Sequence, residues 1–123
     1  MILVHKHIII RAEVKKPIIN KSKGRKFLTK LIKTINMKPL YGPVACYCKM
    51  EGNKGLTAFA IIETSHIAMH IWDEPNPALV QLDVYTCGPF NPQEVLDVLN
   101  VMEPVKVDYK YLDRENNFKE LEI

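Results

Sequence analysis

One stretch of the chain gathers most of the side chains that could carry out chemistry. The segment from Glu63 to Glu74 contains a serine hydroxyl, two imidazoles and several carboxylates, and a thiol follows at Cys87. A hydroxyl can act as a nucleophile when a base is near, and imidazoles and thiols can transfer protons. If these residues lie on adjacent strands, a nucleophile, a base and a proton donor can meet. Taken alone the pattern has low specificity, because a buried thiol usually packs as a small apolar group.

Hydrophobic periodicity predicts the elements that would position these side chains. Strands are predicted at about 2–14, 44–50, 56–63, 66–72, 79–86 and 105–111. A first helix is predicted at about 25–37, where apolar residues recur at helical spacing. A second helix is predicted from Asn91 to about Val101, because Asn91 can cap it and Pro92 suits its first turn. The pair Gly42-Pro43 predicts a break before the second strand.

These elements predict the fold class. A chain of 123 residues that is 47% hydrophobic can form one core, so we expect a single domain over residues 1–123. Several consecutive strands with two separate helices predict an α+β two-layer sandwich, in which a mostly antiparallel sheet carries both helices on one face. The other face is free to pack against a second subunit.

Charge is distributed unevenly along the chain. Residues 1–50 hold twelve Lys and Arg against one acidic residue, and residues 51–123 hold five against thirteen. The basic stretch 15–26 has no interleaved aromatic residues for base stacking, and lysines on the solvent face of a helix account for it. We therefore do not expect a nucleic-acid partner.

Composition also bears on the compartment. No run approaches the roughly 18–20 apolar residues that cross a bilayer, and the first residues lack the charge-then-apolar order of a signal peptide. Three cysteines without a disulfide spacing predict reduced thiols. We expect a cytoplasmic protein with no membrane partner.

The chemically rich segment resembles a known family. The pattern S-H-x-x-x-H-x-W-x-E at residues 65–74, followed by D-x-x-T-C-G at residues 83–88, resembles the prokaryotic S-adenosylmethionine decarboxylases. The resemblance is good over about residues 55–88 and looser elsewhere. It implies an S-adenosylmethionine decarboxylase-like fold.

The resemblance also implies roles for particular residues. In that family a zymogen cleaves itself, and the matching bond joins Thr64 to Ser65. Ser65 would then become the pyruvoyl cofactor. The family histidine that assists processing matches His70, and Thr57 stands where a serine that assists processing is usual. The cysteine that donates a proton to the substrate matches Cys87.

The implied reaction is the decarboxylation of S-adenosylmethionine for polyamine, and hence spermidine, biosynthesis. In that family the pyruvoyl ketone forms a Schiff base with the substrate amine and accepts electrons as carbon dioxide leaves. Trp72 and Glu74 match the family's W-x-E element and are expected to bind the substrate. A homodimer with shared active sites is also expected.

Three residues depart from the family pattern and bear on processing. Thr64 replaces a glutamate, Thr57 replaces a serine and Ala58 replaces a glycine. Other hypotheses also remain: a related pyruvoyl decarboxylase of ornithine or arginine, because the match is poorest in the substrate-contacting loops; an unprocessed relative that binds or regulates; and a basic nucleic-acid-binding module.

The catalytic interpretation makes one demand on the backbone. Ser65 and His70 are five residues apart, so a regular strand would place them on opposite faces. A bulge or a sharp bend at Ser65 is therefore required.

No metal site is predicted. The pairs Cys46/Cys48 and His5/His7 each share a strand face and together could bind zinc, but the spacing is not that of a zinc knuckle.

Overall fold

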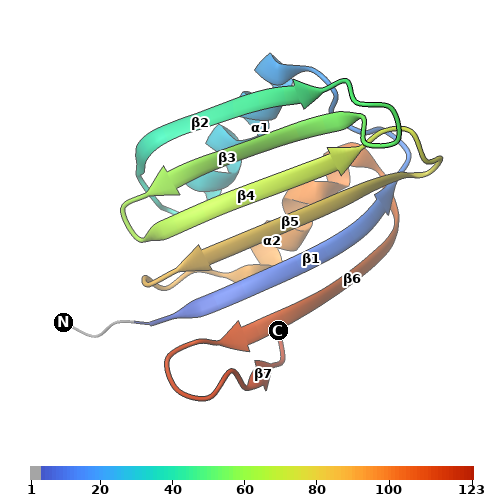
Figure 1. Cartoon of the computed structure of the whole chain (residues 1–123). Helices are drawn as coiled ribbons and strands as arrows, with labels where there is room; N and C mark the ends of the chain where they lie inside the picture. The colour runs from blue at the N-terminus through green and yellow to red at the C-terminus, as the bar shows by residue number, and fades with distance from the viewer. Residues whose placement is uncertain (1–3) are drawn as a thin grey trace.

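The computed structural model describes residues 4–123 and arranges them as one antiparallel sheet with two helices on one face (Figure 1). The strands are β1 (Lys6–Val14), β2 (Pro39–Cys48), β3 (Gly55–Ile62), β4 (Ser65–Trp72), β5 (Ala78–Thr86), β6 (Pro104–Asp113) and β7 (Glu120–Leu121). The helices are α1 (Lys21–Thr34) and α2 (Pro92–Val98), and a 3₁₀ turn at Leu99–Met102 continues α2. The strands lie in the order β2-β3-β4-β5-β1-β6-β7. The predicted α+β two-layer fold with a mostly antiparallel sheet is confirmed.

The core forms between the helices and the sheet face beneath them. In β3, β4 and β5 nearly every second residue is buried, as expected when one face of a sheet is covered and the other is not. The sheet contributes Ile8, Ile67, Met69 and Leu82, and α1 contributes Leu28 and Leu31. The uncovered face, called the outer face below, carries the intervening residues.

Helix α1 begins four residues before its predicted start. The side chain of Asn20 accepts a hydrogen bond of 3.0 Å from the Lys23 N–H and so caps the helix. The first turn is mostly polar, so the apolar periodicity gave no signal there. Within it, Gly24 is buried against Leu56 of β3, where a larger side chain would collide. The absence of a side chain lets the helix approach the sheet closely.

The predicted break at Gly42-Pro43 is wrong, because β2 runs through it. The pairing of β2 with β3 shifts register between Tyr41 and Val44 instead. Strand β2 lies at the edge of the sheet, where a proline does not interrupt a second ladder of hydrogen bonds.

The remaining elements lie close to their predicted positions. Residues 2 and 3 of the predicted first strand fall outside the described part of the chain. Strand β7 was not predicted; it is two residues long and pairs with β6. Among the described residues, no helix is long and apolar enough to cross a membrane.

Candidate active site

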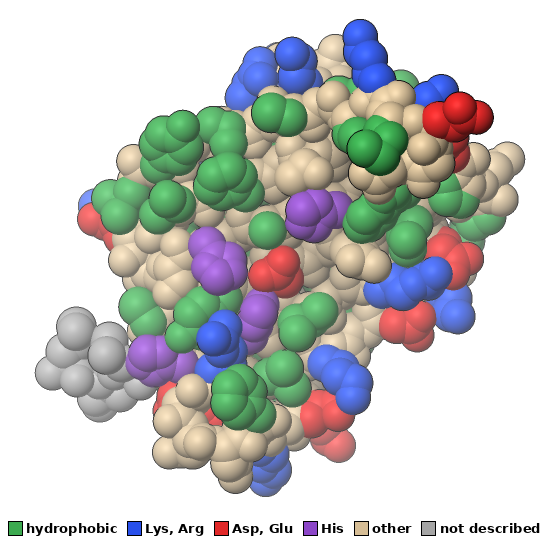
Figure 2. Space-filling view, in the orientation of Figure 1, with side chains coloured by type: hydrophobic (Ala, Val, Ile, Leu, Met, Phe, Trp, Pro, Cys, Tyr) green, Lys and Arg blue, Asp and Glu red, His purple; other side chains and the backbone are tan. Residues whose placement is uncertain are grey.

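The outer face of the sheet carries three of the predicted site residues, Thr57, His70 and Trp72. Figure 2 shows histidine side chains gathered around an acidic side chain near the middle of this face, with exposed hydrophobic side chains over β2 and β3. The exposed hydrophobic residues there include Leu40, Tyr41, Phe59 and Ile61. Polar and apolar groups therefore meet on a surface that no other element of the described chain covers.

Ser65 begins β4 and has an unusual backbone conformation. Its φ is +133°, a value that non-glycine residues rarely adopt. Ser65 pairs with Ile62 and Thr86, and the register continues unbroken to Trp72. The positive φ marks a local departure from regular strand geometry, but β4 contains no inserted residue, so a bend that turns Ser65 toward the face of His70 stays a prediction.

The carbonyl group before Ser65 is hydrogen-bonded. The N–H of Cys87 donates to the carbonyl oxygen of Thr64 at an N···O distance of 2.7 Å. The turn that positions Cys87 is held by Thr86, whose buried hydroxyl accepts a hydrogen bond of 3.1 Å from the Gly88 N–H and also contacts the Gly88 carbonyl oxygen. The structure therefore brings together Thr64, Ser65 and the half-buried Cys87.

The side chain of Thr64 is also held in place. Its hydroxyl Oγ1 lies 2.9 Å from Sδ of Met37. A Cβ at Gly88 would lie 3.1 Å from Cγ2 of Thr64, so Gly88 leaves room for the threonine. Thr64 thus fits tightly between Met37, in the segment after α1, and the turn after β5.

Thr57 and His70 form a second group. They are cross-strand partners on β3 and β4, and Thr57 Oγ1 lies 3.1 Å from His70 Nδ1. The His70 ring is stacked with Trp72, with ring centroids 6.0 Å apart and an interplanar angle of 30°. The predicted pair of processing residues therefore makes direct contact.

Trp72 and Glu74 are tied to the turn between β2 and β3. Trp72 Nε1 donates to Asn53 Oδ1 at 2.7 Å, and the Lys54 N–H donates to Glu74 Oε1 at 3.1 Å. Glu74 thus already accepts a backbone hydrogen bond in the isolated chain.

A second contact holds the same corner. The hydroxyl of Tyr47 donates to Asp73 Oδ2 at 2.6 Å, and this hydrogen bond raises the pKa of Tyr47. Together these contacts fix the residues that follow β4.

The two groups are separated within one chain. At about 3.3 Å per residue, the five residues from Ser65 to His70 span about 16 Å of strand. Trp72 lies at the opposite end of β4 from Ser65. The sequence suggested that the nucleophile, the base and the proton donor meet. Within one chain, Cys87 contacts Thr64 next to Ser65 and Thr57 contacts His70, but these two groups lie apart.

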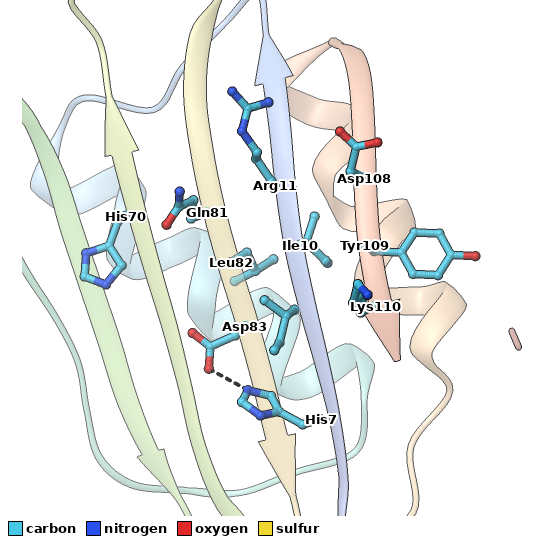
Figure 3. A pocket seen from close by; sticks show the side chains of 11 residues that line it. His7, Ile10, Arg11, His70, Gln81, Leu82, Asp83, Asp108, Tyr109 and Lys110 are labelled. Atoms are coloured by element: carbon cyan, nitrogen blue, oxygen red, sulfur yellow. Dashed lines mark hydrogen bonds and ion pairs between the residues drawn. The ribbon is translucent and has the colours of Figure 1, made fainter. Parts of the chain in front are cut away.

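A hollow of about 570 Å³ lies on the sheet beside these groups (Figure 3). Its charged and polar lining includes His7, Arg11, His70, Gln81, Asp83 and Lys110. Figure 3 shows His7 on β1 and Asp83 on β5 joined by a hydrogen bond, with 2.9 Å between His7 Nε2 and Asp83 Oδ2. The hollow spans strands that are far apart in the sequence.

Sequence reasoning missed Arg114 near this hollow. Its guanidinium lies 3.9 Å from the centre of the Tyr85 ring, and its Nη1 is 3.3 Å from His7 Nδ1. No local motif marks Arg114, because its position depends on the pairing of β6 with β1. The zinc site considered from Cys46, Cys48, His5 and His7 is not assembled in this chain, because β3, β4 and β5 separate β2 from β1.

Comparisons with known proteins agree with this fold and motif. The family model described as S-adenosylmethionine decarboxylase matches residues 6–115. The chain is 37% identical over 68 residues to an S-adenosylmethionine decarboxylase proenzyme of Picrophilus torridus, a match that covers 54% of this chain and 51% of the relative. It is 42% identical over 64 residues to the proenzyme of Pyrobaculum arsenaticum, covering 50% of each protein. The chain thus spans about half the length of the curated relatives it matches.

The solved structures include a similar fold. A crystal structure of the adenosylmethionine decarboxylase from Aquifex aeolicus superposes with a TM-score of 0.70 at 22% identity, covering 100% of both chains. Because the family model covers most of the chain, the assignment does not depend on that low identity. The chain belongs to the S-adenosylmethionine decarboxylase family.

Proposed function

We propose that residues 1–123 act as one domain that cleaves itself between Thr64 and Ser65 and then decarboxylates S-adenosylmethionine. The proposal rests chiefly on one observation, the hydrogen bond of 2.7 Å from the Cys87 N–H to the Thr64 carbonyl oxygen, next to the strained backbone of Ser65. The family membership and the proenzyme names of the relatives support it. The product would feed polyamine and spermidine synthesis in the cytoplasm.

The first step would be attack of Ser65 Oγ on the carbonyl carbon of Thr64, which exchanges the peptide bond for an ester. The Cys87 N–H would stabilise the negative charge that develops on the carbonyl oxygen, as an oxyanion-hole donor does. Proximity of the hydroxyl to its neighbouring carbonyl supplies much of the acceleration.

The second step would be removal of the α-proton of Ser65 by His70. The Cβ–Oγ bond then breaks, and residues 1–64 leave with a terminal carboxylate. Addition of water and loss of ammonia leave a ketone at residue 65. Thr57, in contact with His70 Nδ1, would orient the imidazole for this step.

The residues around Ser65 fit a pyruvoyl group. This group supplies a carbonyl that binds the substrate amine and withdraws electrons during decarboxylation. Cys87 would donate the proton that the substrate carbon receives, because a positioned thiol can act as a general acid. Trp72 and Glu74 would bind the substrate.

We further propose that the active site is shared between two copies of this chain. His70 lies about 16 Å along the strand from the serine of its own chain, so a second copy would have to bring its His70 and Thr57 to Ser65. The exposed hydrophobic residues of the outer face support such packing, since Ile9, Phe59 and Ile61 are 44%, 38% and 43% exposed. A homodimer would cover them.

The mass of the purified chain tests the proposal. We expect two fragments, residues 1–64 and 65–123, from the wild type and one intact chain from Ser65→Ala. Ser22→Ala is a matched control, because Ser22 is an exposed serine of α1 and should leave cleavage unchanged. An intact wild-type chain, or cleavage that persists in Ser65→Ala, would overturn the proposal.

The substrate is tested separately. Release of labelled carbon dioxide from S-adenosylmethionine, ornithine and arginine should be compared on the cleaved protein. Turnover of S-adenosylmethionine alone is expected. Turnover of ornithine or arginine instead would leave the proposed self-cleavage standing and overturn the assignment of S-adenosylmethionine as the substrate.

A further inference from the structure

The side chains of His7 on β1, His66 on β4 and Asp83 on β5 converge on the outer face, next to the proposed active site. His66 on β4, Tyr85 on β5 and His7 on β1 lie in one row across the sheet. Asp83 precedes Tyr85 by two residues and therefore shares its face. His7, His66 and Asp83 each offer one ligand atom, and these three atoms all lie within 4.8 Å of one another.

We infer that His7, His66 and Asp83 form a binding site for a divalent cation such as Zn²⁺. Two imidazoles and one carboxylate are a donor set that suits Zn²⁺ and neighbouring transition metals. Nothing in the proposed cleavage or decarboxylation uses these three side chains, so the inference goes beyond that function and does not depend on it.

The distances fit an ion placed between the three ligands. Bond lengths of about 2.0–2.2 Å place two ligand atoms of a tetrahedral Zn²⁺ about 3.3–3.5 Å apart. Asp83 Oδ2 lies 2.9 Å from His7 Nε2 and 3.6 Å from His66 Nε2. These two values bracket the required separation, and the two imidazole nitrogens lie within 4.8 Å of each other, so side-chain rotations that bring the three ligand atoms together would complete the site.

In the isolated chain the site is also accessible. The side chains of His7, Asp83 and His66 are 16%, 29% and 48% exposed. His7 and Asp83 line the hollow, so the remaining coordination position would face it. Three protein ligands with one open position is the arrangement that zinc sites use when the ion also binds water or a ligand.

Arg114 opposes ion binding in a specific way. A guanidinium only donates hydrogen bonds, so its contact with His7 Nδ1 leaves the proton of the neutral ring on Nε2, the atom that faces Asp83. An ion at Nε2 requires that proton to move to Nδ1. Arg114 must then release His7, while its stacking on Tyr85 can remain.

Two substitutions of Arg114 test this competition, because only one of them should increase the affinity for the ion. Arg114→Gln removes the positive charge and supplies a carbonyl that can accept from His7 Nδ1–H, which orients a metal-bound imidazole. We expect it to tighten binding severalfold. Arg114→Lys keeps a cationic donor and should not tighten binding.

The experiment uses untagged full-length protein that has been treated with a chelator and dialysed. Titration calorimetry with Zn²⁺ should show one ion per chain, and the visible spectrum of bound Co²⁺ should indicate nitrogen and oxygen ligands without a thiolate band. His66→Ala and Asp83→Asn should each weaken binding by at least about tenfold, since even residues behind metal ligands change affinity by about 10–100-fold.

His5→Ala is the matched control. It removes an imidazole that contacts the Tyr85 hydroxyl at 3.1 Å and is not among the three ligands, so affinity should stay within twofold or so of the wild type. No ion bound by the wild type, equal affinity in His66→Ala, or a thiolate band from bound Co²⁺ would each overturn the inference. Because the readout is binding, the result is independent of whether the chain cleaves itself.

Discussion

The backbone N–H of Cys87 donates a hydrogen bond to the carbonyl oxygen of Thr64, with an N···O distance of 2.7 Å. In the proposed function, Cys87 therefore has two separate roles. The backbone of Cys87 would assist cleavage by holding the carbonyl that Ser65 attacks. Its thiol would act later as the proton donor to the substrate.

These roles are separable by mutation. We expect Cys87→Ala to cleave at close to the wild-type rate, because the backbone N–H remains. Decarboxylation by the cleaved variant should fall by about 10²–10⁴-fold, the usual contribution of a positioned proton donor. Cleavage is measured by intact mass and turnover by carbon dioxide release. A variant that fails to cleave but folds, as judged by circular dichroism, would contradict this division.

Complementation tests whether a second copy supplies His70. Ser65→Ala lacks the nucleophile and His70→Ala lacks the base, so each alone should stay intact. When the two are co-expressed, mixed dimers contain one complete site, and the His70→Ala chain should be cleaved.

The control is co-expression of His70→Ala with a Ser65→Ala/His70→Ala double variant, which should give no fragments. Absence of cleavage in the first mixture, with mixed dimers shown to form by affinity tagging of one chain, would argue against a shared site.

The contact between Thr57 and His70 predicts a graded effect on cleavage. Thr57→Val keeps the shape of the side chain and removes the hydroxyl that lies 3.1 Å from His70 Nδ1. A neutral hydrogen bond contributes about 0.5–1.5 kcal/mol, so processing should slow by about two- to tenfold. Thr57→Ser keeps the hydroxyl and should process like the wild type. Rates are followed by the appearance of the fragment 65–123, and equal rates in both variants would exclude an orienting role.

The turn between β6 and β7 should respond to pH. A side-chain hydrogen bond from Lys6 lowers the pKa of Glu115, and the backbone N–H of Glu115 lowers the pKa of Asp113. Carboxyl groups with lowered pKa values stabilise the folded turn above their ordinary pKa values. That stabilisation is lost as the pH falls through their folded values, below 4.5 for Glu115 and below 3.8 for Asp113.

Amide hydrogen exchange measures this effect. The N–H of Arg114 donates to the His5 carbonyl oxygen at 2.8 Å, and the His5 N–H donates to Glu115 Oε1 at 3.0 Å. After correction for intrinsic rates, protection of these two amides should be lower at about pH 3 than at about pH 7. Glu115→Gln should lower the protection of His5 at neutral pH. The same protection at both pH values would contradict the assigned role of the carboxylates.

Much of the fold could be predicted from local patterns. Alternation of apolar residues marks β3, β4 and β5, because one sheet face is buried and the other is not. Apolar alternation and spacing failed to predict the bounds of elements that burial does not determine. Edge strand β2 tolerates Pro43, and the start of α1 depends on the cap at Asn20 rather than on apolar spacing.

The site was only partly predictable. The motif led to Ser65, His70 and Cys87, and alternation explains why Thr57 and His70 can meet across two strands. The gap between Ser65 and His70 follows from their placement on one regular strand, because β4 runs without interruption from Ser65 to Trp72. Arg114 and the convergence of His7, His66 and Asp83 depend on which strands are neighbours, which no local motif reveals.

The order of the strands has a consequence for a chain cut after Thr64. Strand β1 belongs to the fragment of residues 1–64, yet it lies between β5 and β6, which belong to the fragment of residues 65–123. Strand β3 likewise stays hydrogen-bonded to β4. Strands of the two fragments therefore alternate in one hydrogen-bonded sheet. The two fragments should elute together in size-exclusion chromatography until a denaturant separates them.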